Sequence, residues 1–119
     1  MVEREYQRIK EIIQKNFRSK KLSLDKVILF GSYSKGEETS ESDIDLLILS
    51  KDFRKKTIFE KAEIMGDLDW ELVSNTKKPF DIIYYSDEEW ENGQSVSFVK
   101  QSSMGKLFTD DRNISLELY

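Results

Sequence analysis

Two stretches of the chain, VILFGS at residues 27–32 and DIDLLIL at residues 43–49, determine the expected fold. The first is a short run of strand-forming residues that stops at a glycine. The second begins polar and becomes apolar on both faces, as a central strand covered by helices does. Residues two apart on a strand point to the same face, so Asp43 and Asp45 should stand side by side. The sequence therefore predicts neighbouring carboxylates at the start of a buried strand.

Hydrophobic periodicity extends this core in both directions along the chain. Apolar residues recur at steps of three and four over about residues 3–18 and 57–72, which predicts two amphipathic helices. In the second helix the apolar set is Ile58, Phe59, Ala62, Met65, Leu68 and Leu72. The other predicted elements are a strand at 80–85, a short helix opened by a capping box at 86–89, a helix near 96–99 and an edge strand at 106–108. We expect an α/β (α+β) fold in which helices flank a small mixed sheet of about three strands, forming a single domain over residues 1–119.

The composition restricts the chemistry that such a domain can perform. The chain has 119 residues, 19 Lys+Arg against 23 Asp+Glu, and neither Cys nor His. A disulfide framework, a thiolate metal site and a histidine base are thereby excluded, so a metal would be held by oxygen, as Mg²⁺, Mn²⁺ and Ca²⁺ are. The net charge of -4 argues against broad attachment to nucleic acid. The sequence contains no apolar run of membrane-spanning length and its first residues do not resemble a signal peptide, so we expect a cytoplasmic protein without membrane contacts.

Two further features accompany the Asp43 and Asp45 pair. Gly31 at the end of the first strand lets the backbone approach a ligand, and the hydroxyl of Ser32 adds to a cradle suited to phosphate oxygens. An ordinary strand-ending turn is the alternative interpretation of this dipeptide. Asp81 begins the third strand in an apolar setting, where a carboxylate is costly unless it is paired or metal-bound. These features meet at one sheet edge if the second and third strands are parallel neighbours and the first is antiparallel to the second.

The segment LFGSYSKG at residues 29–36, followed by SDIDL at residues 42–46, resembles the signature of the DNA polymerase beta-type nucleotidyltransferase superfamily. Within it the chain is similar to the minimal nucleotidyltransferases, the small antitoxin-like partners of HEPN-domain toxins. The resemblance covers about residues 25–90 and includes the later Asp81.

The resemblance implies roles for six residues. Gly31 and Ser32 would hold the nucleotide triphosphate, and Lys35 would contact phosphate. Asp43 and Asp45 would ligate Mg²⁺, with two ions expected, and Asp81 would complete the catalytic and metal-binding carboxylate set.

The function implied is transfer of a nucleoside monophosphate, AMP from ATP, to a hydroxyl of a partner protein. That partner would be a HEPN toxin, bound in a hetero-oligomer and neutralised by the modification. Two alternatives stay open: an antitoxin that acts by binding alone, and a transferase that acts on a small molecule or an RNA end.

Other conspicuous residues have a structural interpretation. Lys51, Arg54, Lys55, Lys56 and Lys61 form a basic cluster that we interpret as solvated surface. Trp70 and Trp90 are interpreted as packing or interface residues, and an exposed tryptophan would be an obvious partner anchor.

Overall fold

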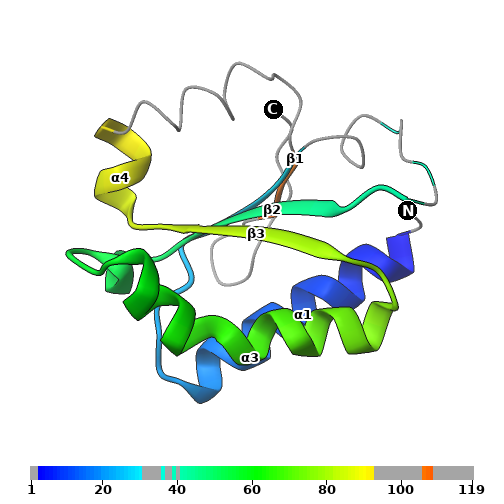
Figure 1. Ribbon diagram of the computed structural model, residues 1–119, viewed down its shortest axis with the longest axis horizontal. Helices are drawn as coiled ribbons and strands as arrows, with labels where there is room; N and C mark the ends of the chain where they lie inside the picture. Colours follow the sequence, from blue (N-terminus) through cyan, green and yellow to red (C-terminus); the bar gives the residue numbers. More distant parts are fainter. Residues whose placement is uncertain (1–2, 31–35, 37–38, 40, 93–105, 109–119) are drawn as a thin grey trace.

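The computed structural model describes residues 3–30, 36, 39, 41–92 and 106–108. Figure 1 shows the sheet with two long helices along one side of it and a short helix beyond one end of the other side. In chain order the elements are α1 (Glu3–Ser19), β1 (Lys26–Phe30), β2 (Ile44–Leu49), the 3-10 helix η1 (Lys51–Phe53), α3 (Ile58–Thr76), β3 (Phe80–Tyr85), α4 (Asp87–Asn92) and β4 (Lys106–Phe108). The predicted mixed α/β architecture is confirmed.

The described strands form one mixed sheet in the order β3-β2-β1-β4. β1 is antiparallel to β2, and β2 is parallel to β3, which is the arrangement required for the predicted features to meet at one edge. The predicted edge strand is confirmed as β4, which pairs antiparallel with β1 and makes the fourth strand of the sheet. The helix predicted near 96–99 lies outside the described residues.

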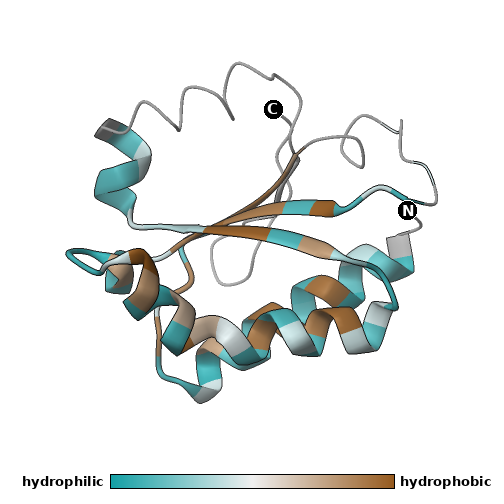
Figure 2. Cartoon of the chain, in the orientation of Figure 1, coloured by the Kyte–Doolittle hydropathy of each residue, from teal (hydrophilic) through white to brown (hydrophobic). Residues whose placement is uncertain are grey.

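One face of the sheet packs against α1 and α3 to form the main core. Ile9, Ile13 and Phe17 are at most 1% exposed and lie on the apolar face predicted for the first helix. They contact the side chains of β1 and β2 that alternate toward this face. Figure 2 shows hydrophobic segments in the strands and in the two long helices beside them. Burial of each such aliphatic side chain stabilises the fold by roughly 1.5 to 3 kcal/mol. This packing therefore fixes the positions of the strands, and with them the side chains on the other face of the sheet.

The structure corrects two details of the second predicted helix. α3 runs to Thr76 rather than ending near residue 72, because its last turn is polar and carries no apolar periodicity. Lys77 ends it with a left-handed backbone at φ 60° and donates its N–H to the Val73 carbonyl at 2.8 Å. The six apolar residues predicted for this helix also do not all face the core. The side chains that are buried are Lys61, Met65, Leu68 and Leu72.

The second face of the sheet carries a smaller apolar cluster that α4 covers in part. Trp90 of α4 is 6% exposed and packs with Ile28, Leu47 and Leu49. The predicted capping box at the start of α4 is confirmed, because the Ser86 hydroxyl accepts from Glu89 N–H at 3.1 Å and the Glu89 carboxylate accepts from Ser86 N–H at 2.9 Å. None of the helices in the described ranges combines the length and the hydropathy that a membrane span requires.

Candidate active site

Two of the predicted carboxylates face each other across the parallel strands β2 and β3. Asp45 and Asp81 are register partners, and Asp45 is also paired with Phe30, the last residue of β1. Because Leu47 and Ile83 alternate toward the smaller cluster, Asp45 and Asp81 point to the same face, away from α1 and α3. The central strand therefore places Asp45 between Asp81 and the point where β1 ends.

Asp43 lies two residues before Asp45, one position before β2 begins. Asp43 and Asp81 are exposed, while Asp45 is half-buried. Burial, together with the smaller effects of the negative charges of Asp81 and Asp43, raises the pKa of Asp45 to about 6. The three carboxylates thus interact electrostatically, and the negative charge is least favourable on Asp45, which lies between the other two.

This electrostatic pattern fits a divalent cation. A positive ion beside Asp45 would offset both the burial of its charge and the repulsion from its neighbours, and carboxylate oxygens are the ligands that Mg²⁺ prefers. Within the ranges that the structure describes, no three acidic side chains stand close enough together to hold an ion as they are placed. The carboxylates gather at one edge of the sheet, and their joint role as a metal site stays a prediction.

The predicted phosphate-binding residues Gly31, Ser32 and Lys35 lie outside the described residues. Their sequence position directly follows Phe30, whose backbone is paired with Asp45. Their roles also stay predictions.

Two grooves lie along the outer edge of β3, beside Asp81. One of about 610 Å³ is lined by residues of α3, β3 and α4, among them Ile58, Lys61 and Glu89. The other, of about 300 Å³, lies further along α3 and is lined by Ala62, Gly66, Met65 and Asp69. Asp81 lines both grooves, so they run along the strand edge on which this residue lies.

Lys61 contradicts the prediction that its basic cluster is solvated surface. It is 6% exposed, and its ammonium group donates to the Glu89 carboxylate at 2.7 Å and to the Tyr84 carbonyl at 3.0 Å. The ammonium also lies 5.7 Å from the centre of the Tyr85 ring. Lys61 lies four residues before Met65, on the buried side of α3. Its burial could not be predicted from its residue type, because a lysine is rarely buried unless it is paired.

A second Asp-x-Asp pair, Asp67 and Asp69, lies on the helix α3 and shows that this spacing does not bring carboxylates together on a helix. Asp67 accepts hydrogen bonds from Lys20, which directly follows α1, and from Asn16 of α1, and these bonds hold its pKa below the usual value. Asp69 instead lines the smaller groove. On a helix, residues two apart point in different directions, so this pair cannot act on one ligand as two strand carboxylates can.

The mixed sheet and its carboxylates are consistent with a known family of protein domains. The chain belongs to the nucleotidyltransferase domain family, whose model matches residues 7–105. The resemblance seen in residues 29–46 is thereby confirmed at the level of the family.

Relatives of known name share parts of the sequence. Two proteins of Methanocaldococcus jannaschii, both named as candidate protein adenylyltransferases, are 42% identical over 60 residues and 49% identical over 45 residues. These matches cover 50% and 34% of this chain, and 54% and 42% of the relatives. The chain thus matches only about half the length of these proteins.

Solved structures share the fold. A candidate nucleotidyltransferase from Sulfolobus solfataricus superimposes with a TM-score of 0.54 at 24% identity, covering 71% of this chain and 69% of that one. A toxin-antitoxin structure with AMP-PNP has a TM-score of 0.50 at 24% identity, covering 74% of this chain and 62% of that one. At this level of identity the likeness establishes the common fold.

Proposed function

We propose that this chain, as a single nucleotidyltransferase domain, transfers AMP from ATP to a hydroxyl group of a partner protein in an Mg²⁺-dependent reaction. The observation that carries the proposal is the pairing of Asp45 with Asp81 across parallel strands, with Asp43 beside them and the pKa of Asp45 raised to about 6. Family membership adds the reaction class.

The chemistry follows from the positions of the carboxylates. An acceptor hydroxyl attacks the α-phosphorus of ATP, a new P–O bond forms, the bond to the bridging oxygen breaks, and pyrophosphate leaves. We assign to Asp81 the role of accepting the proton that the hydroxyl loses, and its exposure beside both grooves supports this assignment. The domain contains no histidine that could take this role.

Asp43, Asp45 and Asp81 are the residues that would hold Mg²⁺. When bound, the ions supply stabilisation of the negative charge on the attacking and leaving oxygens. Asp45, at the centre of the set, orients the site because its strand is fixed on both sides by β1 and β3. Gly31, Ser32 and Lys35 would bind the triphosphate.

We propose a HEPN toxin as the acceptor, which makes the chain a cytoplasmic antitoxin that works in a hetero-oligomer. Support comes from the relatives named as candidate protein adenylyltransferases and from the toxin-antitoxin structure that shares the fold. The net charge of -4 is consistent with a protein partner rather than a nucleic acid.

A second candidate function is neutralisation of the partner by binding alone. The observation that favours it is that the described acidic side chains, as placed, do not form a ready group of three metal ligands. An antitoxin of this kind would lose nothing when a site carboxylate is neutralised.

The test uses ATP labelled at the α-phosphate, Mg²⁺ and the product of the neighbouring gene as the proposed HEPN acceptor. We expect label on the HEPN protein with the wild type, and a loss on the order of 100-fold or more with Asp43→Asn. Glu11→Gln is the matched control, because it neutralises one exposed carboxylate on α1, and it should transfer label normally. Toxin neutralisation in cells by Asp43→Asn, with no label transfer, would favour the binding function instead.

A further inference from the structure

We propose that the outer face of α3 is the surface on which the acceptor protein docks, and that this acceptor is apolar at the centre of its contact and basic at the rim. The inference rests on the proposed transfer to a protein hydroxyl. We call this surface the α3 stripe, and it consists of Ile58, Phe59, Ala62, Gly66, Trp70 and Val73.

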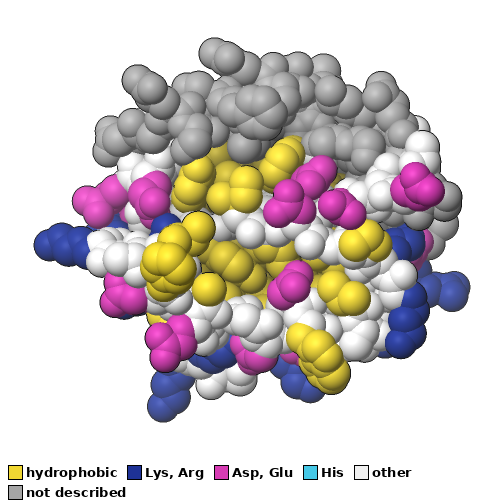
Figure 3. All heavy atoms as spheres, in the orientation of Figure 1, with side chains coloured by type: hydrophobic (Ala, Val, Ile, Leu, Met, Phe, Trp, Pro, Cys, Tyr) yellow, Lys and Arg dark blue, Asp and Glu magenta, His cyan; other side chains and the backbone are white. Residues whose placement is uncertain are grey.

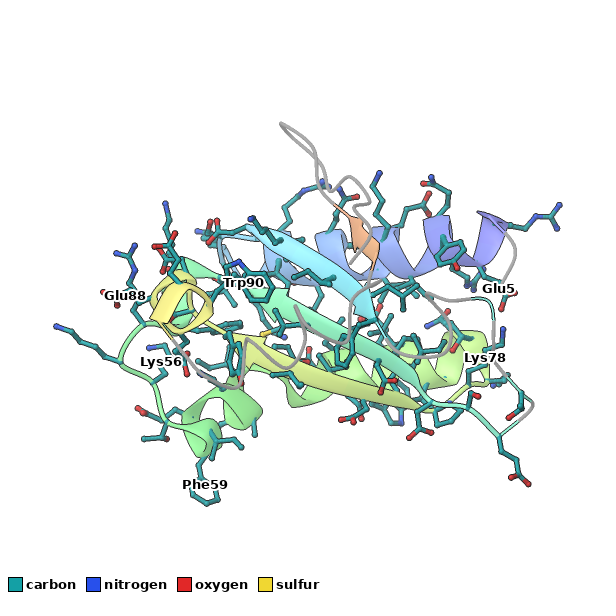
Figure 4. The ribbon with its side chains drawn as sticks, turned by 90° about the horizontal axis from the view of Figure 1, so that it is seen from above. Glu5, Lys56, Phe59, Lys78, Glu88 and Trp90 are labelled. Carbon is teal, nitrogen blue, oxygen red and sulfur yellow. The ribbon has the colours of Figure 1, made fainter. Side chains whose placement is uncertain are left out.

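The α3 stripe exposes large hydrophobic side chains. Phe59 is 81% exposed, Ile58 75% and Trp70 72%, and Figure 4 shows Phe59 pointing away from the body of the protein. Val73 joins them at 37%. The α3 stripe lies on one side of α3, because its members follow one another at steps of three or four from Phe59 to Val73 and Ile58 is four residues before Ala62.

Folding does not require this apolar surface. The sheet is already covered by an adjacent side of α3, where Met65, Leu68 and Leu72 are fully buried. A helix with a second apolar side is typical of a protein that contacts a partner, and exposed Trp and Phe are the residue types that anchor such contacts.

The middle of the α3 stripe is shallow. Ala62 and Gly66 lie between the two large ends, and a Cβ atom built on Gly66 would meet no other atom within 4 Å. A partner surface can therefore approach the helix backbone closely between Phe59 and Trp70.

The α3 stripe is continuous with the candidate active site. Ile58 and Ala62 line the groove of about 610 Å³, and Ala62 and Gly66 line the groove of about 300 Å³. Both grooves reach Asp81 on β3. A protein that covers the α3 stripe would thus lie against the outer edge of β3, and its hydroxyl side chain would reach around this edge to the exposed Asp81.

The charged residues around the α3 stripe indicate what kind of protein surface it binds. Glu60, Glu63 and Asp69 are exposed on α3, and its lysine, Lys61, is buried against Glu89. Figure 3 shows acidic side chains among the hydrophobic ones on this face, with Lys and Arg gathered toward its margins. An acidic rim attracts a basic protein surface and repels both nucleic acid and a second copy of this chain.

The edge of β3 is a less suitable contact for the partner. The Tyr85 carbonyl accepts from Ser50 N–H toward β2, so the Tyr84 carbonyl points to the outer edge. The Lys61 ammonium already occupies that carbonyl at 3.0 Å. Addition of a partner strand is therefore opposed at this point, and the side chains of the α3 stripe are left to make the contact.

The test compares label transfer from ATP to the proposed HEPN acceptor by the wild type and by the double variant Phe59→Ser/Trp70→Ser. We expect the acceptor KM of the double variant to rise on the order of 10- to 100-fold, with Kd for Mg·ATP unchanged. Glu63→Lys should also raise KM, whereas Glu11→Lys, the matched reversal on exposed α1, should not. Unfolding by urea checks that the variants fold like the wild type.

Three results would overturn the inference. If the wild type transfers label and the double variant has an unchanged acceptor KM, docking occurs elsewhere while the proposed function stands. If the chain alone is a dimer that the double variant dissociates, the α3 stripe is a self-association surface. If the wild type labels no HEPN protein, the proposed function fails and the docking inference fails with it.

Discussion

Replacing Asp45 by asparagine should stabilise the metal-free protein, although it removes a residue proposed to be essential. In the folded chain the pKa of Asp45 is raised from 3.8 to about 6 by burial and by the charges of Asp81 and Asp43. The carboxylate of Asp45 therefore binds its proton less tightly in the unfolded chain than in the folded one. Stability therefore falls as pH rises from about 4 to about 6 and stays lower above that range.

The magnitude follows from the same pKa values. At about 1.4 kcal/mol per pH unit, the gap from 3.8 to about 6 corresponds to about 3 kcal/mol for a fully buried charge. Asp45 is only half-buried, so solvent screening reduces the expected penalty to about 1 kcal/mol. Asparagine has nearly the same shape and no charge, so Asp45→Asn should gain about that amount at pH 8 and almost nothing at about pH 4.

Urea unfolding in EDTA measures this difference, with Glu11→Gln as the control that neutralises a distant exposed carboxylate. Adding Mg²⁺ at pH 8 should raise the free energy of unfolding of the wild type and leave Asp45→Asn nearly unchanged. If the variant is no more stable than the wild type at pH 8 without divalent ions, the electrostatic account of the site is wrong. An equal Mg²⁺ effect on both proteins would contradict the assignment of Asp45 as a ligand.

Three further predictions concern the scaffold, and each is checked by the free energy of unfolding. Leu68→Ala should lose about 2 to 5 kcal/mol, because Leu68 is fully buried between α3 and the sheet; a smaller loss, below about 1 kcal/mol, would show that the core is loosely packed there. Thr57→Ala should lose about 1 kcal/mol, since the Thr57 hydroxyl accepts from Glu60 N–H at 3.1 Å in a capping box, whereas a neutral effect would mean that this cap adds nothing to stability. Lys61→Met should lose about 1 to 3 kcal/mol by leaving the Tyr84 carbonyl without its donor, and adding Glu89→Gln should recover part of the loss if the ion pair couples the two residues.

Much of this fold is legible in the sequence because its elements have strong periodic patterns. The helix over about residues 3–18 and the strands at 27–30, 43–49 and 80–85 were predicted within one residue of their observed bounds. The positions of Asp43 and Asp45 before and within β2, and of Asp81 within β3, are likewise local properties of the chain.

The direction in which α3 presents its side chains was not legible. Its apolar residues cover more than one side, and periodicity alone cannot say which side meets the sheet. The packing of β1 and β2 selects Met65, Leu68 and Leu72, which leaves Phe59 and Trp70 exposed. The same rotation buries Lys61, and Glu89 on α4 compensates its charge.

The sequence by itself determined the elements of this protein, its resemblance to nucleotidyltransferases and the three carboxylates with which its candidate site is built. Only the tertiary structure decided that Asp45 and Asp81 face each other and that an apolar surface beside them is left open. The physical reason is that strand and helix patterns are encoded by neighbours along the chain, whereas pairing and burial depend on contacts between segments far apart in it.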